Sequence, residues 1–194
     1  MVKTAFCILA AAAAAGIALA PGVASAATAA PAGPAVLAYS STPPGGDPDT
    51  TVTFDVTVGA LSMTAPTDST LGAGAPGSTI TGTLGAVTVT DDRALLTASW
   101  TVTASSTDWT TGGATPAETV LAGDGGYDPG TITTTGTITT TGTPITLANT
   151  AAPIVTGSAG VGNNTASWDP DIAIAVPAAA VGGIYVGTIT QSVS

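Results

Sequence analysis

The sequence predicts an all-β protein, a single antiparallel β-sandwich of about nine or ten strands that is immunoglobulin-like or a flattened barrel. Threonine supplies most of the polar positions, and its β-branched side chain suits a pleated surface better than a helix. The 25 glycines and 14 prolines divide the 194 residues into short segments that end in tight turns. Hydrophobic residues make up 44% of the chain and charged residues only 7%, which is not the composition of a disordered protein.

The first 26 residues predict a secretory signal peptide. Lys3 precedes an apolar run over residues 6–20, and Ala24 and Ala26 have the small side chains that a signal peptidase accepts. We therefore expect cleavage after Ala26 and a secreted protein that is extracellular or associated with the cell wall. The alternative is an uncleaved membrane anchor, but the apolar run is shorter than the roughly 20 residues that a spanning helix needs.

Residues 27–49 are rich in alanine, proline and glycine, and they predict a flexible lead-in to a sandwich domain over residues 50–194. The first strand of that domain is predicted from a strict alternation of apolar and polar residues, which is typical of a half-buried strand with one wet face. Its apolar positions are Val52, Phe54, Val56 and Val58, continued past a predicted bulge at Gly59 by Leu61 and Met63.

The other strands are predicted from shorter apolar and β-branched runs between turn signals. They cover residues 80–90, 95–103, 108–110, 118–121, 154–156, 166–176 and 183–193, and the threonine-rich stretch 132–146 is expected to form a hairpin or an edge ribbon. Asp91–Arg93 and Asn163–Thr165 are interpreted as turns. We expect Trp100 and Trp168 in the core, and Trp109 to be partly exposed.

The residues that most enzymes use are missing. The chain has no histidine, and signal cleavage would remove Lys3 and Cys7, which excludes Ser-His-Asp, Cys-His and Ser-Lys catalysis and histidine-ligated zinc. Carboxylates remain, so the alternative is a two-carboxylate glycoside hydrolase, although the acids lie mostly beside proline or glycine in turns. We predict that the protein is not an enzyme and needs no cofactor.

The net charge of the chain further limits the classes of partner that we expect. The formal net charge is −10, and after signal cleavage Arg93 is the only basic residue left against 12 acidic ones. Nucleic acid and anionic membranes are therefore not expected partners. Acidic loops at Asp91–Asp92 and Asp124–Gly130 raise calcium binding as an alternative, but they lack the EF-hand pattern and such residues are common in turns, so we predict no metal site.

Two segments together resemble the WxL-domain surface proteins of Gram-positive bacteria. The first is Val87–Arg93 followed by Ser99–Thr103, which is similar to the family's proximal motif of a strand, an Asp-x-Arg turn and Trp-x-Leu in the next strand. The second is Tyr185–Val193, which is similar to the distal motif of Tyr, three further residues and then Leu-Thr-Trp-x-Leu. Val102 stands at the position of the proximal leucine, and Gln191 at that of the distal tryptophan.

The resemblance implies a surface protein that associates non-covalently with peptidoglycan or another glycan of the cell wall. No Leu-Pro-x-Thr-Gly sorting signal follows the domain, so we expect no covalent anchor. We take Trp100, Trp109 and Tyr185 as candidate binding residues, with a role for Trp100 and Tyr185 in the core as the alternative. The structural residues of the two motifs are Asp91, Arg93, Val102, Ile189 and Val193.

A second hypothesis is a structural or adhesive subunit. Such a protein would assemble with itself, or bind other surface proteins, through the edges of its β-sheets. The stretch Thr131–Thr143 lacks the lysines that usually protect a strand edge, so pairing there is chemically easy.

Overall fold

The computed structural model describes residues 50–113 and 115–194, and Thr53–Ser194 form one compact unit. The predicted signal peptide and lead-in, residues 1–26 and 27–49, lie outside the described residues. The described chain is all-β, with twelve strands and two short 3-10 helices. None of the described helices is long and apolar enough to cross a membrane.

Every pair of neighbouring strands is antiparallel. The strands, in chain order, are β1 (Leu61–Thr64), β2 (Thr79–Thr83), β3 (Val87–Ser106), β4 (Trp109–Thr110), β5 (Thr119–Val120), β6 (Gly125–Asp128), β7 (Thr133–Thr135), β8 (Thr139–Gly142), β9 (Ile145–Thr146), β10 (Ala152–Trp168), β11 (Asp171–Ala175) and β12 (Ile189–Val193). The 3-10 helices η1 (Pro116–Glu118) and η2 (Ala122–Asp124) flank β5.

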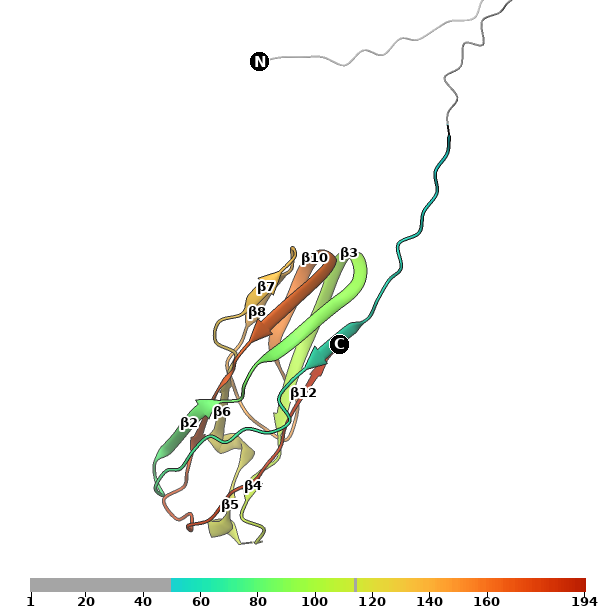
Figure 1. Ribbon diagram of the computed structural model, residues 1–194. Helices are drawn as coiled ribbons and strands as arrows, with labels where there is room; N and C mark the ends of the chain where they lie inside the picture. The colour runs from blue at the N-terminus through green and yellow to red at the C-terminus, as the bar shows by residue number, and fades with distance from the viewer. Residues whose placement is uncertain (1–49, 114) are drawn as a thin grey trace, which may run out of the picture. The chain divides into compact units, whose positions relative to one another are not determined.

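Two long strands, β3 and β10, form the framework. They pair from Ala152 opposite Ala104 to Trp168 opposite Val87, and both curve over at the same end of the domain (Figure 1). Ala94 in β3 has a φ of 51°, and β10 shifts its register repeatedly between residues 157 and 164. Such irregularities bend a strand, so the pair folds over together at this corner without losing its ladder.

The corner divides β3 and β10 into arms that lie in two layers. In one layer β1 and β7 flank the pair, and in the other β12 and β8 flank it. Val87 and Val89 in the first arm of β3 are buried, as are Trp100 and Val102 in the second arm, and all four belong to one core cluster. Two layers that bury apolar faces against each other make a β-sandwich, which confirms the predicted fold class.

Shorter strands extend both layers away from the corner. The ladder of β3 and β10 continues into β2 and β11 through a hydrogen bond from the Leu84 N–H to the Pro170 carbonyl (3.0 Å). The sheet there has the order β2-β11-β6-β9. In the other layer β4 pairs with β5, and a bridge between Thr110 and Val186 adds the segment that precedes β12. Figure 1 shows β2, β4 and β5 at the end opposite the corner.

Three predicted turns or loops lie within strands, one of them Asn163–Thr165 in β10. Asp91–Arg93 does not separate two strands, because the chain bends there while it remains within β3. Residues 125–128 of the acidic stretch Asp124–Gly130 form β6, whose Tyr127 is buried. Gly125 allows this strand to form, since a Cβ at that position would lie 2.5 Å from the Trp109 ring.

The first predicted strand is only partly present. Leu61–Thr64 pair with β3, but residues 50–58 form no strand, and Phe54, Val56 and Val58 are exposed by 83%, 65% and 65%. The expected bulge at Gly59 is found, because the Gly59 N–H donates to the Asp92 carbonyl (2.8 Å) while the Asp92 N–H donates to the Ala60 carbonyl (3.0 Å). The apolar face ahead of Gly59 therefore has no partner within the described chain.

Candidate functional site

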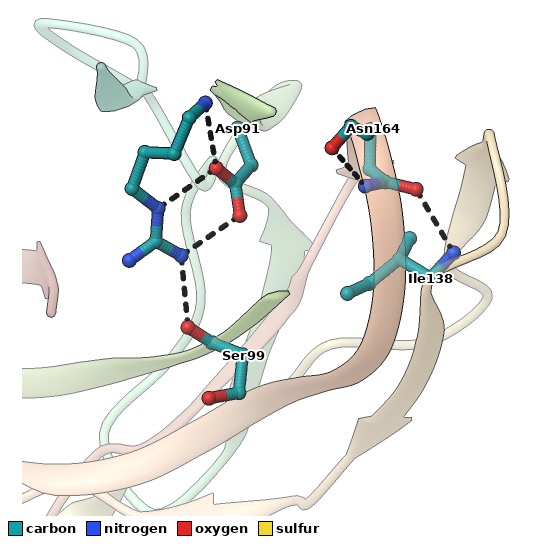
Figure 2. A network of polar contacts seen from close by, with 6 residues as sticks. Asp91, Ser99, Ile138 and Asn164 are labelled. Carbon is teal, nitrogen blue, oxygen red and sulfur yellow. Dashed lines mark hydrogen bonds and ion pairs between the residues drawn. The ribbon is translucent and has the colours of Figure 1, made fainter. Parts of the chain in front are cut away.

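Asp91 and Arg93 form an ion pair at the corner of β3 (Figure 2). The buried Asp91 carboxylate accepts hydrogen bonds from Nε and Nη2 of Arg93, each at 2.8 Å. Nη2 also donates to the carbonyl oxygen of Ser99 (2.9 Å), six residues further along the strand. A straight strand rises about 3.3 Å per residue, so the side chain reaches Ser99 only because the strand bends. Arg93 thus ties the two arms of β3 together.

The electrostatics of this pair fit a structural role. The hydrogen bonds from the Arg93 side chain hold the pKa of Asp91 below its usual range, although burial acts in the opposite direction. Asp91 is therefore charged at neutral pH, and both of its carboxylate oxygens accept hydrogen bonds from Arg93. The structural role of Asp91 and Arg93 stays a prediction from the resemblance, and these contacts are consistent with it.

Asn164 is a second buried polar residue at the corner and lies opposite Asp91 in the ladder of β3 and β10. Its side-chain oxygen accepts hydrogen bonds from the backbone N–H groups of Thr137 (2.8 Å) and Ile138 (3.1 Å). Its amide nitrogen donates to the Gly162 carbonyl (2.9 Å) (Figure 2). Asn164 belongs to β10 and fastens the connection between β7 and β8 to it, so interpreting this residue as part of a turn was wrong.

A chain of hydrogen-bonded side chains connects β10, β6 and β12, with Trp168 and Tyr127 buried and Gln191 half-buried. Trp168 Nε1 donates to the Tyr127 hydroxyl (3.0 Å), and that hydroxyl donates to Oε1 of Gln191 (2.9 Å). Burial raises the pKa of Tyr127 to about 12. Gln191 therefore supplies an acceptor that a buried tyrosine hydroxyl needs, which no inspection of the neighbouring residues could have indicated.

The candidate binding tryptophans are core residues. Trp100 is 4% exposed and Trp109 is 7% exposed, so the expected partial exposure of Trp109 is wrong. Gly187 contributes to its burial, since a Cβ there would lie 2.9 Å from the indole nitrogen. Tyr185 packs against the core, and its hydroxyl has the carbonyls of Ala117 (3.0 Å) and Val181 (2.9 Å) as acceptors. Neither Trp100 nor Trp109 offers an exposed ring face for stacking on a sugar.

The acidic residues of the stretch Asp124–Gly130 are part of local secondary structure and turns. Asp124 ends a 3-10 helix, and the carboxylate of Asp128 accepts the N–H of Gly130 (2.9 Å). Among the described residues, no three His, Cys, Asp or Glu side chains come together as a metal site would require.

An apolar groove of about 660 Å³ lies at the end opposite the corner. Residues 69–76 form one wall and residues 180–187 form the other, while Trp109, Val120 and Ile174 supply apolar surface between them. No residue that lines the groove is charged. A smaller hollow of about 220 Å³ shares Trp109 and Ile174 with it and extends along the segment that leads into β12.

An open strand edge accompanies the groove. Val186 exchanges two backbone hydrogen bonds with Thr110, both at 3.0 Å. In an antiparallel pair, alternate residues point their backbone groups to opposite sides, so Tyr185 and Gly187 turn theirs to the outer edge. No backbone group in the described chain pairs with them there. Ile184 and Val186 are 84% and 66% exposed. The groove therefore combines apolar side chains with an unpaired edge.

No family model matches the chain, and no curated protein or solved structure matches it either. The resemblance to WxL-domain proteins therefore stays a prediction from two sequence segments. The structure places these segments side by side, since Val193 in β12 lies opposite Val102 in β3. Val102 is buried, and Ile189 and Val193 pack against the core.

Proposed function

We propose that the chain is a secreted, non-enzymatic surface protein that binds other proteins through the open strand edge beside its apolar groove. The observation that carries this proposal is the combination of unpaired backbone groups at Tyr185 and Gly187 with an uncharged groove next to them. An extended segment that adds to such an edge gains backbone hydrogen bonds, and its alternate side chains enter the groove.

The contents of the groove support binding over catalysis. A glycoside hydrolase needs two carboxylic acids at the scissile bond, and the lining of the groove contains no carboxylate. Its apolar walls, including the exposed Ile184, suit the apolar side chains of a protein partner better than the hydroxyl groups of a sugar.

Association with the cell wall remains a prediction from sequence. The burial of Trp100 and Trp109 removes the aromatic faces that we had considered for glycan contacts, so wall association would have to use other residues. Fractionation of the wall, the membrane and the medium, together with a pulldown on isolated cell walls, measures it directly.

The protein-binding proposal is tested on intact cells with a photo-crosslinking residue at position 184. We expect adducts with protein, and accessibility of the chain to added protease. A crosslinker at position 96 is the matched control, because Leu96 is also exposed, by 80%, but lies at the corner of β3. Adducts with glycan only, equal adducts from both positions, or a chain that protease cannot reach would contradict the proposal.

A further inference from the structure

We propose that the groove of one molecule receives the extended segment Val52–Val58 of a second copy of the same chain, so that copies join head to tail. This inference rests on the proposed function, because it names the partner of the same edge and groove. The bound segment would add a strand beside Tyr185 and Gly187 and would direct its apolar side chains toward Trp109.

The residues of this segment alternate as they do in a strand whose apolar face is covered by a partner. Phe54, Val56 and Val58 alternate with threonine and one aspartate, so all three fall on one face when the chain is extended. That face is exposed, and no strand in the described chain pairs with it. An amphipathic strand with a solvated apolar face is unfavourable unless a partner covers it.

The groove has the complementary chemistry. Its lining is free of charge, and the backbone groups of Tyr185 and Gly187 beside it are open to an added strand. With the apolar face of the segment turned inward, Asp55 and the threonines would remain in water. Addition of the segment would thus pair the edge and cover the apolar rim around Ile184 in one step.

A molecule cannot fill its own groove with this segment. Val58 directly precedes Gly59, whose N–H is bonded to the Asp92 carbonyl at the corner. The groove is lined by Ile80 of β2 and Trp109 of β4, and Figure 1 shows these two strands at the opposite end. From Gly59 the chain enters the β1 ladder, with Leu61 opposite Asp91. Val58 therefore stays at the corner while this ladder is intact, and the donor must come from another molecule.

Charge favours this contact over other contacts between copies. Each chain carries a formal net charge of −10, so two copies repel each other over most of their surfaces. The groove carries no charge, and the segment contributes only Asp55, on the face that would point outward. The donor and the acceptor lie at different ends, so the interface is heterologous and can propagate into a chain of subunits.

The test measures the mass of the whole chain by sedimentation over a range of concentrations, with protein recovered from the medium or from cells that retain it. We expect wild type to form multimers whose mass rises with concentration. Phe54→Asp, which damages the donor, and Ile184→Asp, which damages the acceptor, should both be monomeric. Both residues are highly exposed, so folding should survive, and tryptophan fluorescence checks this. In the matched controls the same charge is placed on the outward face of the segment (Thr53→Asp) or at the corner (Leu96→Asp). Both controls should assemble like wild type.

Mixing the two defective variants gives the sharpest result. Phe54→Asp retains an intact groove and Ile184→Asp retains an intact donor, so an equal mixture should form dimers with one sound junction and nothing larger. Pairing between two copies of Val52–Val58 would instead let Ile184→Asp dimerise by itself, because that variant keeps a sound segment. That outcome would overturn the inference.

Three other results would also overturn it. One is a wild-type chain that stays monomeric at all concentrations, and another is assembly that survives both Phe54→Asp and Ile184→Asp. The third is assembly that only a lysine on the β7 edge, such as Thr134→Lys, abolishes. If crosslinking from position 184 captures a different protein on cells while the purified chain is monomeric, this inference fails but the proposed function stands.

Discussion

Replacement of Arg93 by methionine tests whether the ion pair at the corner stabilises the folded protein. Asp91 is buried, and in the wild type it accepts two hydrogen bonds from the Arg93 side chain at 2.8 Å and one from the Arg93 N–H at 3.2 Å. Arg93→Met leaves only the backbone donor. We expect a large loss of stability at neutral pH, because a buried carboxylate then has no cation beside it.

The size of the loss follows from the burial of the two partners. Removal of one partner from a fully buried ion pair costs about 3 to 5 kcal/mol. The Arg93 side chain is 29% exposed and the Asp91 side chain 1%, so water already reaches one side of this pair. We therefore expect about 2 to 4 kcal/mol, and this includes the lost bond to the Ser99 carbonyl. Since about 1 kcal/mol corresponds to a shift of roughly 2 to 4 °C in a domain of this size, the midpoint of thermal unfolding should fall by about 4 to 16 °C.

The assay is urea and thermal unfolding between pH 7 and pH 4, followed by tryptophan fluorescence. In wild type the pKa of Asp91 is lowered, so the pair stabilises the protein above the carboxyl's unfolded pKa and is lost as pH falls through the lowered value. In Arg93→Met only the backbone hydrogen bond at position 93 still opposes burial, which favours the neutral form of Asp91, so the deficit should shrink toward pH 4.

Asp91→Asn and the double variant complete a thermodynamic cycle. The double variant should lose less stability than the sum of the two single variants, because either substitution alone breaks the same pair. Equal stability of Arg93→Met and wild type at pH 7, or a deficit that does not change between pH 7 and pH 4, would refute the reasoning.

The remaining predictions concern three other buried contacts. The pKa of Tyr127 is raised to about 12, so the folded state holds a proton that the unfolded chain releases near pH 10. The free energy of unfolding, measured in urea, should therefore fall by about 2 kcal/mol from pH 10 to pH 12. Tyr127→Phe should remove this dependence on pH. Asn164→Leu leaves the N–H groups of Thr137 and Ile138 without their acceptor and should cost about 2 to 4 kcal/mol in urea unfolding, whereas a cost below 1 kcal/mol would contradict the assigned role. Gly157→Ala places a Cβ 2.6 Å from Cζ2 of Trp100, and a blue or red shift of the tryptophan emission with a loss of about 1 to 3 kcal/mol should accompany it.

The local alternation of apolar and polar residues correctly predicted which side chains point into the core, where a second layer of the sandwich packs against them. Val87 and Val89, and further on Trp100 and Val102, fall at alternate positions, and all four are buried. Leu96 falls at the same alternation as Trp100 but is 80% exposed. The connection between the two runs was not predictable in the same way. Asp91–Arg93 has the composition of a turn, but the ladder with β10 holds it in strand geometry, and that pairing joins residues far apart in sequence.

The polar contacts of the core required knowledge of tertiary contacts. Asn164 and Gln191 carry no local signal that distinguishes them from surface residues, yet each satisfies a donor from a distant segment. The burial of Trp109 depends on two glycines, Gly125 and Gly187, that leave room for its ring from different parts of the chain. The resemblance to WxL-domain proteins indicated Asp91 and Arg93, whereas the contacts whose partners are remote in sequence carried no local signal.

The opening of the groove has a structural cause that bears on its function. To close it, the edge at Tyr185 and Gly187 would have to approach the free edge of β2. The loop that includes Leu71 lies against β2: a Cβ at Gly82 would lie 3.2 Å from Leu71, and the Ser69 hydroxyl donates to the Thr83 carbonyl (2.8 Å). This loop holds the two edges apart, so their backbone groups stay unpaired and the apolar rim stays open. A strand from outside the molecule would pair these backbone groups and cover the apolar rim without displacing the loop. An exposed alternating segment of the same chain has the composition to be that strand.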